Sequence, residues 1–580
     1  TECAAWQRAG RELERRGWLH REYRRLPGSA LGCQWQGAQG IERPVLNDAQ
    51  AQALEQITGA PGYQAFLLDG VTGSGKTEVY LRAAEQAISE GGQVLIIMPE
   101  IGLAPQFLKR VKRRLGANVA VLHSDLAAAE RARAWLAASA GDAAVILGTR
   151  SAVFAPLARA GLIIVDEEHD PSLTQQDGFR YSARDLAVLR AHAMDVPVVL
   201  GSATPSLESI QNTAINRYQH ICLPNRAGSA KPPSIQVIDI RARPLCGGLS
   251  DPLQQALRRH LEAGQQVMLF LNRRGYAPLL TCHACGWIAE CRRCDARLTV
   301  HRHAGKMRCH HCGAARPLPD TCPDCGAAEL LPLGPGTERL EEALTKLFPH
   351  YPLLRIDRDT TRRRGELEER LAAAHRGEAQ LLIGTQMLAK GHHLPALTLV
   401  AVVDVDQGLF GTDFRATERL AQLVVQVAGR AGRGDKPGEV LLQTRHPEHP
   451  LLQTLLEHGY SAFAAEHLTE RRAAGLPPFA ALALLRAEAL DANAPYIFLE
   501  AAANWGTSLV RQHKYNVELL GPVPAPMERR EGRYRAQLML RSDQRSSLQD
   551  FLGAWAKQLA DLNGARRVRW SLDVDPVDTV

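Results

Sequence analysis

No apolar run in this chain of 580 residues approaches the roughly 20 uninterrupted residues of a membrane-spanning helix, so we expect no membrane contact. Residues 1–18 are polar and rich in arginine, and they lack the apolar segment of a secretory signal peptide. A cytoplasmic location is therefore expected. Because position 1 is threonine rather than methionine, we also expect the chain to be a fragment of a longer protein.

Glycine and proline, with 48 and 33 residues, are too few for a fibrous or low-complexity protein. Hydrophobic residues make up 45% of the chain and charged residues 23%, as is ordinary for globular proteins. The net charge of +7 permits a nucleic-acid partner without requiring one. At about 150 residues per domain, the length indicates several domains.

Cysteine is scarce outside one segment, where eight of the 12 cysteines form four Cys-x-x-Cys pairs. In an intracellular chain such pairs indicate zinc rather than disulfides or unbound thiols. Four thiolates make one closed tetrahedral site, so eight predict two structural Zn²⁺ ions.

The spacing of the pairs favours a nested arrangement. Five residues separate the first two pairs, whereas fourteen separate Cys294 from Cys309, which fits two opposed zinc knuckles better. The inner site would consist of Cys291, Cys294, Cys309 and Cys312. The outer site would consist of Cys282, Cys285, Cys322 and Cys325.

Short apolar runs alternate with helical patterns from residue 44 to residue 223, which predicts a doubly wound α/β lobe. Its expected strands are 66–68, 94–97, 119–122, 144–147, 162–165 and 196–200. A second set of strands is expected at 267–271, 353–356, 381–383, 399–403 and 440–442. The cysteine block interrupts this set after its first strand and should project from the sheet. Beyond residue 447, a helical stretch and strand-like pieces at 482–486, 537–540 and 568–572 predict a separate α+β domain.

A glycine-rich segment follows the first expected strand and matches G-x-x-x-x-G-K-[ST] at every fixed position. It consists of Gly70, Val71, Thr72, Gly73, Ser74, Gly75, Lys76 and Thr77. Backbone N–H groups and the following helix N-terminus would hold the phosphates of ATP. Lys76 would reach the β- and γ-phosphates, and Thr77 would coordinate Mg²⁺.

Two further motifs carry the charge that phosphoryl transfer needs. Asp166 and Glu167 follow the strand 162–165, where Asp166 would hold Mg²⁺ and Glu167 would orient the attacking water. An acidic helix cap is the alternative, which the upstream phosphate loop disfavours. Arg430 and Arg433, three residues apart in the second set, would reach across a cleft to the γ-phosphate, with a surface arginine pair as the alternative.

Aromatic and basic residues alternate in Phe179, Arg180 and Tyr181, on a loop that contains glycine. The rings can stack on unpaired bases while the arginine meets phosphate; packing of the rings under the loop is the alternative. The arginines of residues 1–40 and of the C-terminal segment 529–569 can form DNA-binding surfaces or solvated faces.

Together with Gly201–Thr204 and the segments 384–386 and 390–391, these motifs resemble the ordered motif set of superfamily 2 helicases. Within that superfamily the chain is similar to the bacterial primosomal replication restart DNA helicases. This resemblance rests on the eight cysteines and on the segments 70–80, 99–103, 148–151, 271–275, 521–524 and 573–576. The resemblance extends from about residue 41 to the end.

The resemblance implies two RecA-like lobes, a zinc-binding insertion in lobe two and a C-terminal α+β domain. The implied segments are 1–40, a partial winged-helix domain and linker; 41–224, lobe one; 225–278 and 333–446, lobe two; 279–332, the insertion; and 447–580, the C-terminal domain. The N-terminal DNA-binding domain of the family would be absent. Gln50 would read adenine, and Arg150 and Lys390 would serve DNA contact or coupling.

The implied activity is an ATP-dependent 3′→5′ DNA helicase that uses ATP with Mg²⁺ and binds stalled or abandoned replication forks. It would unwind the lagging-strand arm and initiate primosome assembly. The implied partners are forked and single-stranded DNA, the single-strand DNA-binding protein, accessory primosome proteins and the loading machinery of the replicative helicase. Two alternatives remain: a zinc-bearing nucleic-acid-binding module with ATP as a switch, and a motor that remodels branches without separating strands.

Overall fold

The structure is a computed structural model, and it describes residues 43–99, 105–116, 118–124, 126–227, 233–271, 280–292, 297–301, 306–309, 314–328, 330–332, 337–356, 366–384, 394, 396–411, 413–432 and 438–579. The expected winged-helix segment 1–40 and the side chains of Cys294, Cys312, Lys390 and Arg433 lie outside these residues. Within the described ranges, none of the helices has the length and apolar content needed to cross a bilayer.

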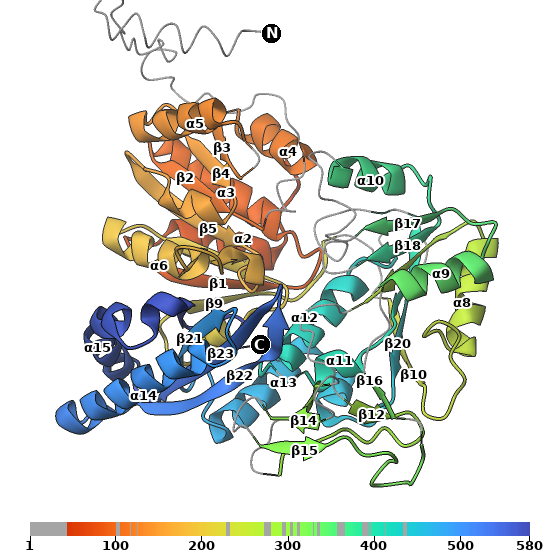
Figure 1. Ribbon diagram of the computed structural model, residues 1–580. Coiled ribbons are helices and arrows are strands. Elements are labelled where there is room, and N and C mark those ends of the chain that lie inside the picture. The colour runs from red at the N-terminus through yellow and green to blue at the C-terminus, as the bar shows by residue number, and fades with distance from the viewer. Residues whose placement is uncertain are drawn as a thin grey trace, which may run out of the picture.

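Seven parallel strands form the first sheet, in the order β3-β4-β2-β5-β8-β1-β9 (Figure 1). Their bounds are β1 Ala65–Gly70, β2 Gln93–Ile97, β3 Val119–Leu122, β4 Val145–Gly148, β5 Ala160–Asp166, β8 Val198–Ser202 and β9 Gln219–Leu223. The six expected strands are confirmed. The edge strand β9 was not expected, because only two of its five residues are buried and it has no continuous apolar run.

Helices cover both faces of this sheet. They are α2 Asp48–Thr58, α3 Lys76–Ser89, α4 Pro105–Leu115, α5 Ala128–Ala140, α6 Ala183–Met194 and α7 Leu207–Ala214. Strand β1 shows why two cores form: Phe66 and Leu68 pack in one core with α3, and Leu67 packs in another with α6. Because successive side chains of a strand point to opposite faces, an uninterrupted apolar strand needs a helical layer on each side.

The second sheet has six parallel strands in the order β10-β20-β19-β11-β18-β17. Their bounds are β10 Ser234–Asp239, β11 Gln266–Phe270, β17 Leu353–Ile356, β18 Leu381–Gly384, β19 Leu397–Val402 and β20 Glu439–Thr444. Its helices are α8 Asp251–Glu262, α9 Thr337–Leu347, α10 Glu366–His375, α11 Asp406–Leu409 and α12 Ala416–Ala428. The chain thus has the two doubly wound lobes that were expected.

One expectation about the second lobe is wrong. The cysteine block follows the second strand of the sheet, β11, and not the first, because β10 precedes it. Strand β10 lies at the sheet edge and is largely exposed, so its sequence lacks the apolar run that marks a buried strand.

The cysteine-rich insertion folds as a small body with its own core around Leu298, Val300 and Met307. It contains a two-stranded sheet, β12 Leu280–Cys282 with β16 Leu330–Pro332, and a three-stranded sheet, β13 Thr299–His301, β14 Lys306–Arg308 and β15 Ala315–Pro317. Neither sheet pairs with the second sheet among the described residues, so the insertion lies outside that sheet, as expected.

The C-terminal part begins with α13, Pro450–Ala473, which is interrupted at Gly459. An antiparallel sheet in the order β22-β23-β21-β24 follows, with bounds β21 Ala481–Ala489, β22 Glu518–Arg530, β23 Arg533–Ser542 and β24 Arg569–Val574. Helices α14 Ala494–His513 and α15 Arg545–Trp555 pack on it (Figure 1). The α+β domain is confirmed. Strand β22 was not expected because it contains three prolines, which its place at the sheet edge tolerates.

Candidate nucleotide, metal and DNA sites

The glycine-rich segment forms the turn between β1 and α3, as predicted. Gly73 and Gly75 have φ angles of 84° and 86°, a left-handed conformation that glycine adopts without strain. Gln50 donates from Nε2 to the carbonyl of Ser74 at 2.8 Å. A Cβ atom on Gly75 would lie 2.3 Å from that same nitrogen. Glycine at position 75 therefore leaves room for the Gln50 side chain, which supports the loop from α2.

Lys76 begins α3, and its Nζ donates to the carbonyl of Gly70 at 2.6 Å. The ammonium group therefore lies at the loop, against the carboxyl end of β1. A helix N-terminus with a cation beside it is suited to a triphosphate. The side chain of Gln50 is already engaged, because its Oε1 accepts from the backbone N–H of Asn47 at 3.0 Å. Its expected role in adenine recognition stays a prediction.

Asp166 lies at the carboxyl end of β5 and accepts a hydrogen bond from the Tyr80 hydroxyl at 3.1 Å. Burial, reinforced by the neighbouring carboxylate of Glu167, raises the pKa of Asp166 to about 6, and Lys76 opposes this rise. A cation bound beside the two carboxylates would favour their charged forms, so the residues present suit Mg²⁺. Glu167 has a φ of 49°, an uncommon backbone conformation for a residue other than glycine.

A chain of hydrogen bonds joins this acidic motif to the second lobe. His169 Nδ1 lies 2.7 Å from Ser202 Oγ, and its Nε2 lies 2.7 Å from Nε2 of Gln426 on α12. Because the glutamine Nε2 only donates, His169 accepts at Nε2 and carries its proton on Nδ1. Neither His169 nor Gln426 was given a role from the sequence, although His169 lies two residues after Glu167 and Gln426 lies four residues before Arg430.

Helix α12 ends at the phosphate loop. A Cβ atom on Gly429, its C-terminal cap, would lie 2.5 Å from Cγ2 of Thr72. Arg430 follows directly, which places this residue beside the phosphate loop. Its predicted partner Arg433 lies outside the described residues.

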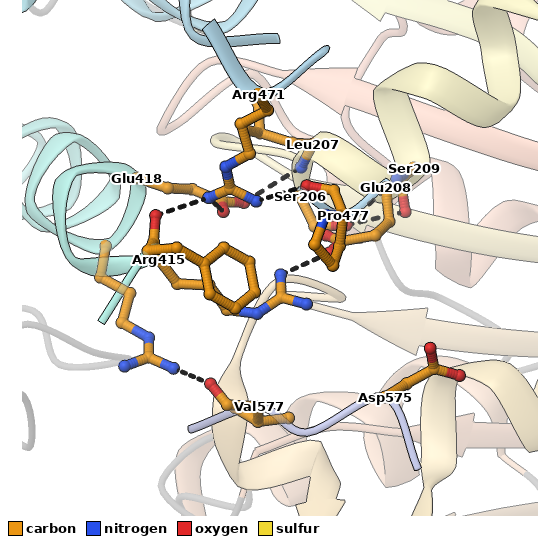
Figure 2. Close-up of polar contacts among 12 residues, drawn as sticks. Ser206, Leu207, Glu208, Ser209, Arg415, Glu418, Arg471, Pro477, Asp575 and Val577 are labelled. Atoms are coloured by element: carbon orange, nitrogen blue, oxygen red, sulfur yellow. Dashed lines mark hydrogen bonds and ion pairs between the residues drawn. The ribbon is translucent and has the colours of Figure 1, made fainter. Parts of the chain in front are cut away.

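The other end of α12 is anchored by buried charges (Figure 2). Glu418 accepts the backbone N–H of Leu207 at 3.0 Å and the Nη2 of Arg471 at 2.7 Å. The side chains of Glu418 and Arg471 are only 5% and 1% exposed. One carboxylate thereby joins α7 of the first lobe, α12 of the second lobe and α13.

A second ion pair, between Arg415 and Glu208, lies beside the first. Although burial opposes it, the guanidinium groups of Arg415 and Arg184 lower the pKa of Glu208 to about 2. Glu208 is therefore held in its charged form beside Arg415.

Three aromatic rings gather on the first lobe near the hairpin of β6, Thr174–Gln175, and β7, Tyr181–Ser182. The ring centroids of Phe154 and Tyr181 lie 4.8 Å apart, and those of Phe179 and Tyr181 lie 5.9 Å apart. Phe179 is 76% exposed and Phe154 is 43% exposed. Phe154 was not predicted to join this cluster, because it is a single aromatic residue on a separate short helix.

The two arginines expected to serve DNA contact or coupling here are engaged within the protein. Arg150 donates from Nη1 to the carbonyls of Ser172 and Thr174 at 3.2 and 3.0 Å, which fixes the base of the hairpin. Arg180 donates from Nη1 to Oδ2 of Asp573 at 2.7 Å. Their DNA contacts stay predictions.

The structure brings together the four cysteines of the predicted outer zinc site. The Sγ atoms of Cys282, Cys285, Cys322 and Cys325 all lie within 4.8 Å of one another. The Cys282–Cys325 and Cys285–Cys322 sulfur distances are 3.6 and 3.7 Å. A tetrahedral Zn²⁺ with bonds of about 2.3 Å requires about 3.8 Å between its sulfurs, so the cluster suits zinc.

The predicted inner site is described only in part, since Cys294 and Cys312 lie outside the described residues. Cys309 nevertheless shares a backbone feature with the outer site. Its N–H donates to the carbonyl five residues later at 2.8 Å, as do those of Cys282 and Cys322, which each begin a Cys-x-x-Cys turn. The inner pairing therefore stays a prediction.

Four family models match the chain. They are a DEAD/DEAH box helicase domain over residues 47–213, a helicase conserved C-terminal domain over 333–435, the cysteine-rich region of the PriA DNA helicase over 291–317, and a primosomal protein N C-terminal domain over 472–577.

Curated relatives span most of the chain. The replication restart protein PriA of Haemophilus influenzae is 50% identical over 92% of this chain and 73% of its own length. That of Bacillus subtilis is 37% identical over 92% of this chain and 66% of its own length. Among solved structures, RecG bound to a three-way DNA junction has 16% identity and a TM-score of 0.47, over 73% of this chain and 47% of its own. The chain therefore carries the domains of an ATP-dependent DNA helicase with a cysteine-rich zinc-binding region, and it belongs to the PriA family of replication restart proteins.

Proposed function

We propose that this chain is the motor of a replication restart helicase that moves 3′→5′ on DNA. It binds stalled or abandoned forks, unwinds the lagging-strand arm and initiates primosome assembly. The observation that carries this proposal is the hydrogen-bonded chain from Gln426 through His169 to Ser202, which joins α12 to the acidic motif at the phosphate loop. A nucleotide held there can change how the two lobes contact each other.

In the proposed reaction, the glycine-rich loop and Lys76 bind the phosphates of ATP, while Thr77 and Asp166 hold Mg²⁺. The bound metal supplies positive charge at the β- and γ-phosphates. Glu167 orients the attacking water, and Arg430 and Arg433 donate to the charge that develops in the transition state. The positioning of these groups, rather than covalent chemistry, would provide most of the acceleration.

We propose two structural Zn²⁺ ions, the second bound by the inner cysteines. The zinc-bearing insertion would contact DNA or partner proteins, because thiolates have no part in phosphoryl transfer. The proposed partners are forked and single-stranded DNA, the single-strand DNA-binding protein, accessory primosome proteins and the machinery that loads the replicative helicase. The proposed location is the cytoplasm, where such forks occur.

The test is ATP hydrolysis with and without single-stranded DNA, followed by unwinding of forked DNA that carries only a 3′ or only a 5′ single-stranded arm. We expect DNA to stimulate hydrolysis and unwinding to require the 3′ tail. Lys76→Ala should abolish turnover and retain DNA binding, and Glu167→Gln should bind ATP but hydrolyse it poorly. If DNA does not change the rate of hydrolysis, the result would favour a nucleic-acid-binding module that uses ATP as a switch. If DNA stimulates hydrolysis but no strands separate, the result would favour a motor that remodels branches.

A further inference from the structure

We call the hairpin of β6 and β7, residues 174–182, the aromatic hairpin. Two neighbouring residues in it have different surroundings. Phe179 is 76% exposed, whereas Arg180 turns towards the C-terminal domain. The Nη1 of Arg180 donates to Oδ2 of Asp573 at 2.7 Å, and its Nη2 donates to Oγ of Ser571 at 3.0 Å. Ser571 and Asp573 are alternate residues of β24 and so share one face of the strand. The hairpin is therefore bound to the sheet edge of the C-terminal domain.

The chain that leaves β24 continues to the second lobe. It turns at Asp575, which has a φ of 52°, and continues to Val577 (Figure 2). The carbonyl of Val577 accepts a hydrogen bond from Nη2 of Arg419 on α12. Arg486 on β21 holds both ends of this segment, because it donates to Oδ2 of Asp573 at 3.0 Å and to the carbonyl of Asp578. Residues 573–578 thus span from the aromatic hairpin to α12.

Helix α12 has its other functional contacts at the ATP site. Gln426 donates a hydrogen bond to His169, and Gly429, at the end of the helix, packs closely beside Thr72 of the phosphate loop. A rigid helix that is contacted near its start and near its end can transmit a shift from one end to the other. The aromatic hairpin is therefore connected to the phosphate loop through the C-terminal domain and α12, as well as through its own lobe.

We propose that Arg180 is a positioning residue, whose ion pair with Asp573 lets DNA at the aromatic hairpin stimulate ATP hydrolysis through residues 573–578 and α12. The proposal rests on the proposed function, because it requires hydrolysis that responds to DNA. It differs from a direct DNA contact by Arg180 in a measurable way. A lost contact weakens DNA binding, whereas a lost positioning link lowers the stimulated rate at saturating DNA.

The experiment compares the parent chain with Arg180→Gln, Asp573→Asn, the double variant and Asp573→Glu, which retains the charge. Asp550→Asn is the matched control, since Asp550 is an exposed aspartate on α15 of the same domain. For each protein, hydrolysis is measured without DNA and with increasing single-stranded DNA. Binding to a labelled oligonucleotide is measured by fluorescence anisotropy, and folding by thermal unfolding.

We expect each single substitution to lower the maximal stimulated rate by roughly two- to thirtyfold, the range of measured coupling effects, while basal hydrolysis and DNA affinity stay within about twofold. The double variant should lose no more than the single variants, and Asp573→Glu should recover part of the stimulation. Weaker DNA binding with an unchanged maximal rate would overturn the proposal in favour of a phosphate contact. Full stimulation in Arg180→Gln would overturn it outright, whereas a parent chain without DNA stimulation would instead refute the proposed function.

Discussion

His169 of the first lobe and Gln426 of the second lobe lie 2.7 Å apart through their Nε2 atoms, and this contact fixes the tautomer of the histidine. The proton on Nδ1 is then directed at Ser202 Oγ, which itself accepts the backbone N–H of Thr204 at 2.9 Å. The acidic motif, the Gly201–Thr204 segment and α12 are thereby linked by hydrogen bonds. His169 Nδ1 also lies 3.7 Å from Oε2 of Glu167, so a change in the lobe contact at α12 can affect Glu167 through His169.

The first prediction follows from this link. Gln426→Ala and His169→Ala should each lower ATP turnover at saturating DNA, because each removes the same connection between the lobes. The double variant should lose no more than the larger single loss, with a coupling energy of about 0.5–3 kcal/mol in the cycle. Steady-state hydrolysis of all four proteins measures it. Strictly additive losses would show that the two side chains act separately.

The second prediction concerns the buried pair of Glu418 and Arg471. Arg471→Met should destabilise the protein by about 3–5 kcal/mol, because it leaves a buried carboxylate without its cation. Glu418→Gln should cost less, since the amide oxygen can still accept the backbone N–H of Leu207. Urea unfolding measures both, and Glu378→Gln, in the exposed pair with Arg376, is the control that should change nothing measurable. Equal stability of Arg471→Met and the parent would contradict the assigned role of the pair.

The third prediction concerns the aromatic cluster. Phe179→Ala with Tyr181→Ala should reduce DNA stimulation more than basal hydrolysis, because base stacking contributes about 1–3 kcal/mol per base. Phe154→Ala should act in the same direction, since its ring contacts both others. Equal loss of basal and stimulated rates would indicate that the rings only support the fold of the loop.

The fourth prediction concerns metal content. Elemental analysis should find two zinc ions per chain, with Cys282→Ser removing the outer ion and Cys291→Ser removing the inner one. Each loss is expected because three thiolates no longer complete a closed tetrahedral site. A single ion in the parent chain, or loss of the outer ion from Cys291→Ser, would rule out the nested pairing.

The fifth prediction uses Asp404, whose pKa burial and the nearby Asp406 raise to about 7. Because the folded-state pKa lies above the unfolded value, stability from this group is complete at low pH and declines as pH rises towards 7. Asp404→Asn keeps an acceptor for the N–H of Gln407, so its stability advantage over the parent should grow from pH 5 to pH 8. Each pKa unit is worth about 1.4 kcal/mol at most. A pH-independent difference in thermal unfolding would contradict this, and Asp550→Asn is the control.

The sequence predicted the central strands and the glycine-rich turn between β1 and α3, because each has a local pattern. The spacing of the cysteine pairs predicted the grouping of Cys282, Cys285, Cys322 and Cys325. The roles assigned to the phosphate loop and the acidic motif stay predictions. Strands β9, β10 and β22 were missed, since edge strands are half exposed or contain proline and therefore lack a continuous apolar run. The contacts between lobes could not be found either. Glu418, Arg471 and Leu207 are far apart along the chain, and nothing local indicates that one carboxylate joins them.

The position of the cysteine-rich insertion has a consequence for how the second lobe is made. Strand β11 ends at residue 270, yet its partners β18 and β19 begin at residues 381 and 397. The centre of the sheet therefore cannot form until these later residues have been synthesised. Closing so long a loop slows folding. Pairing of β12 with β16 beside Cys282 and Cys325 brings the two ends of the insertion together. Zinc captured by the nascent chain would therefore shorten the effective loop before the lobe closes.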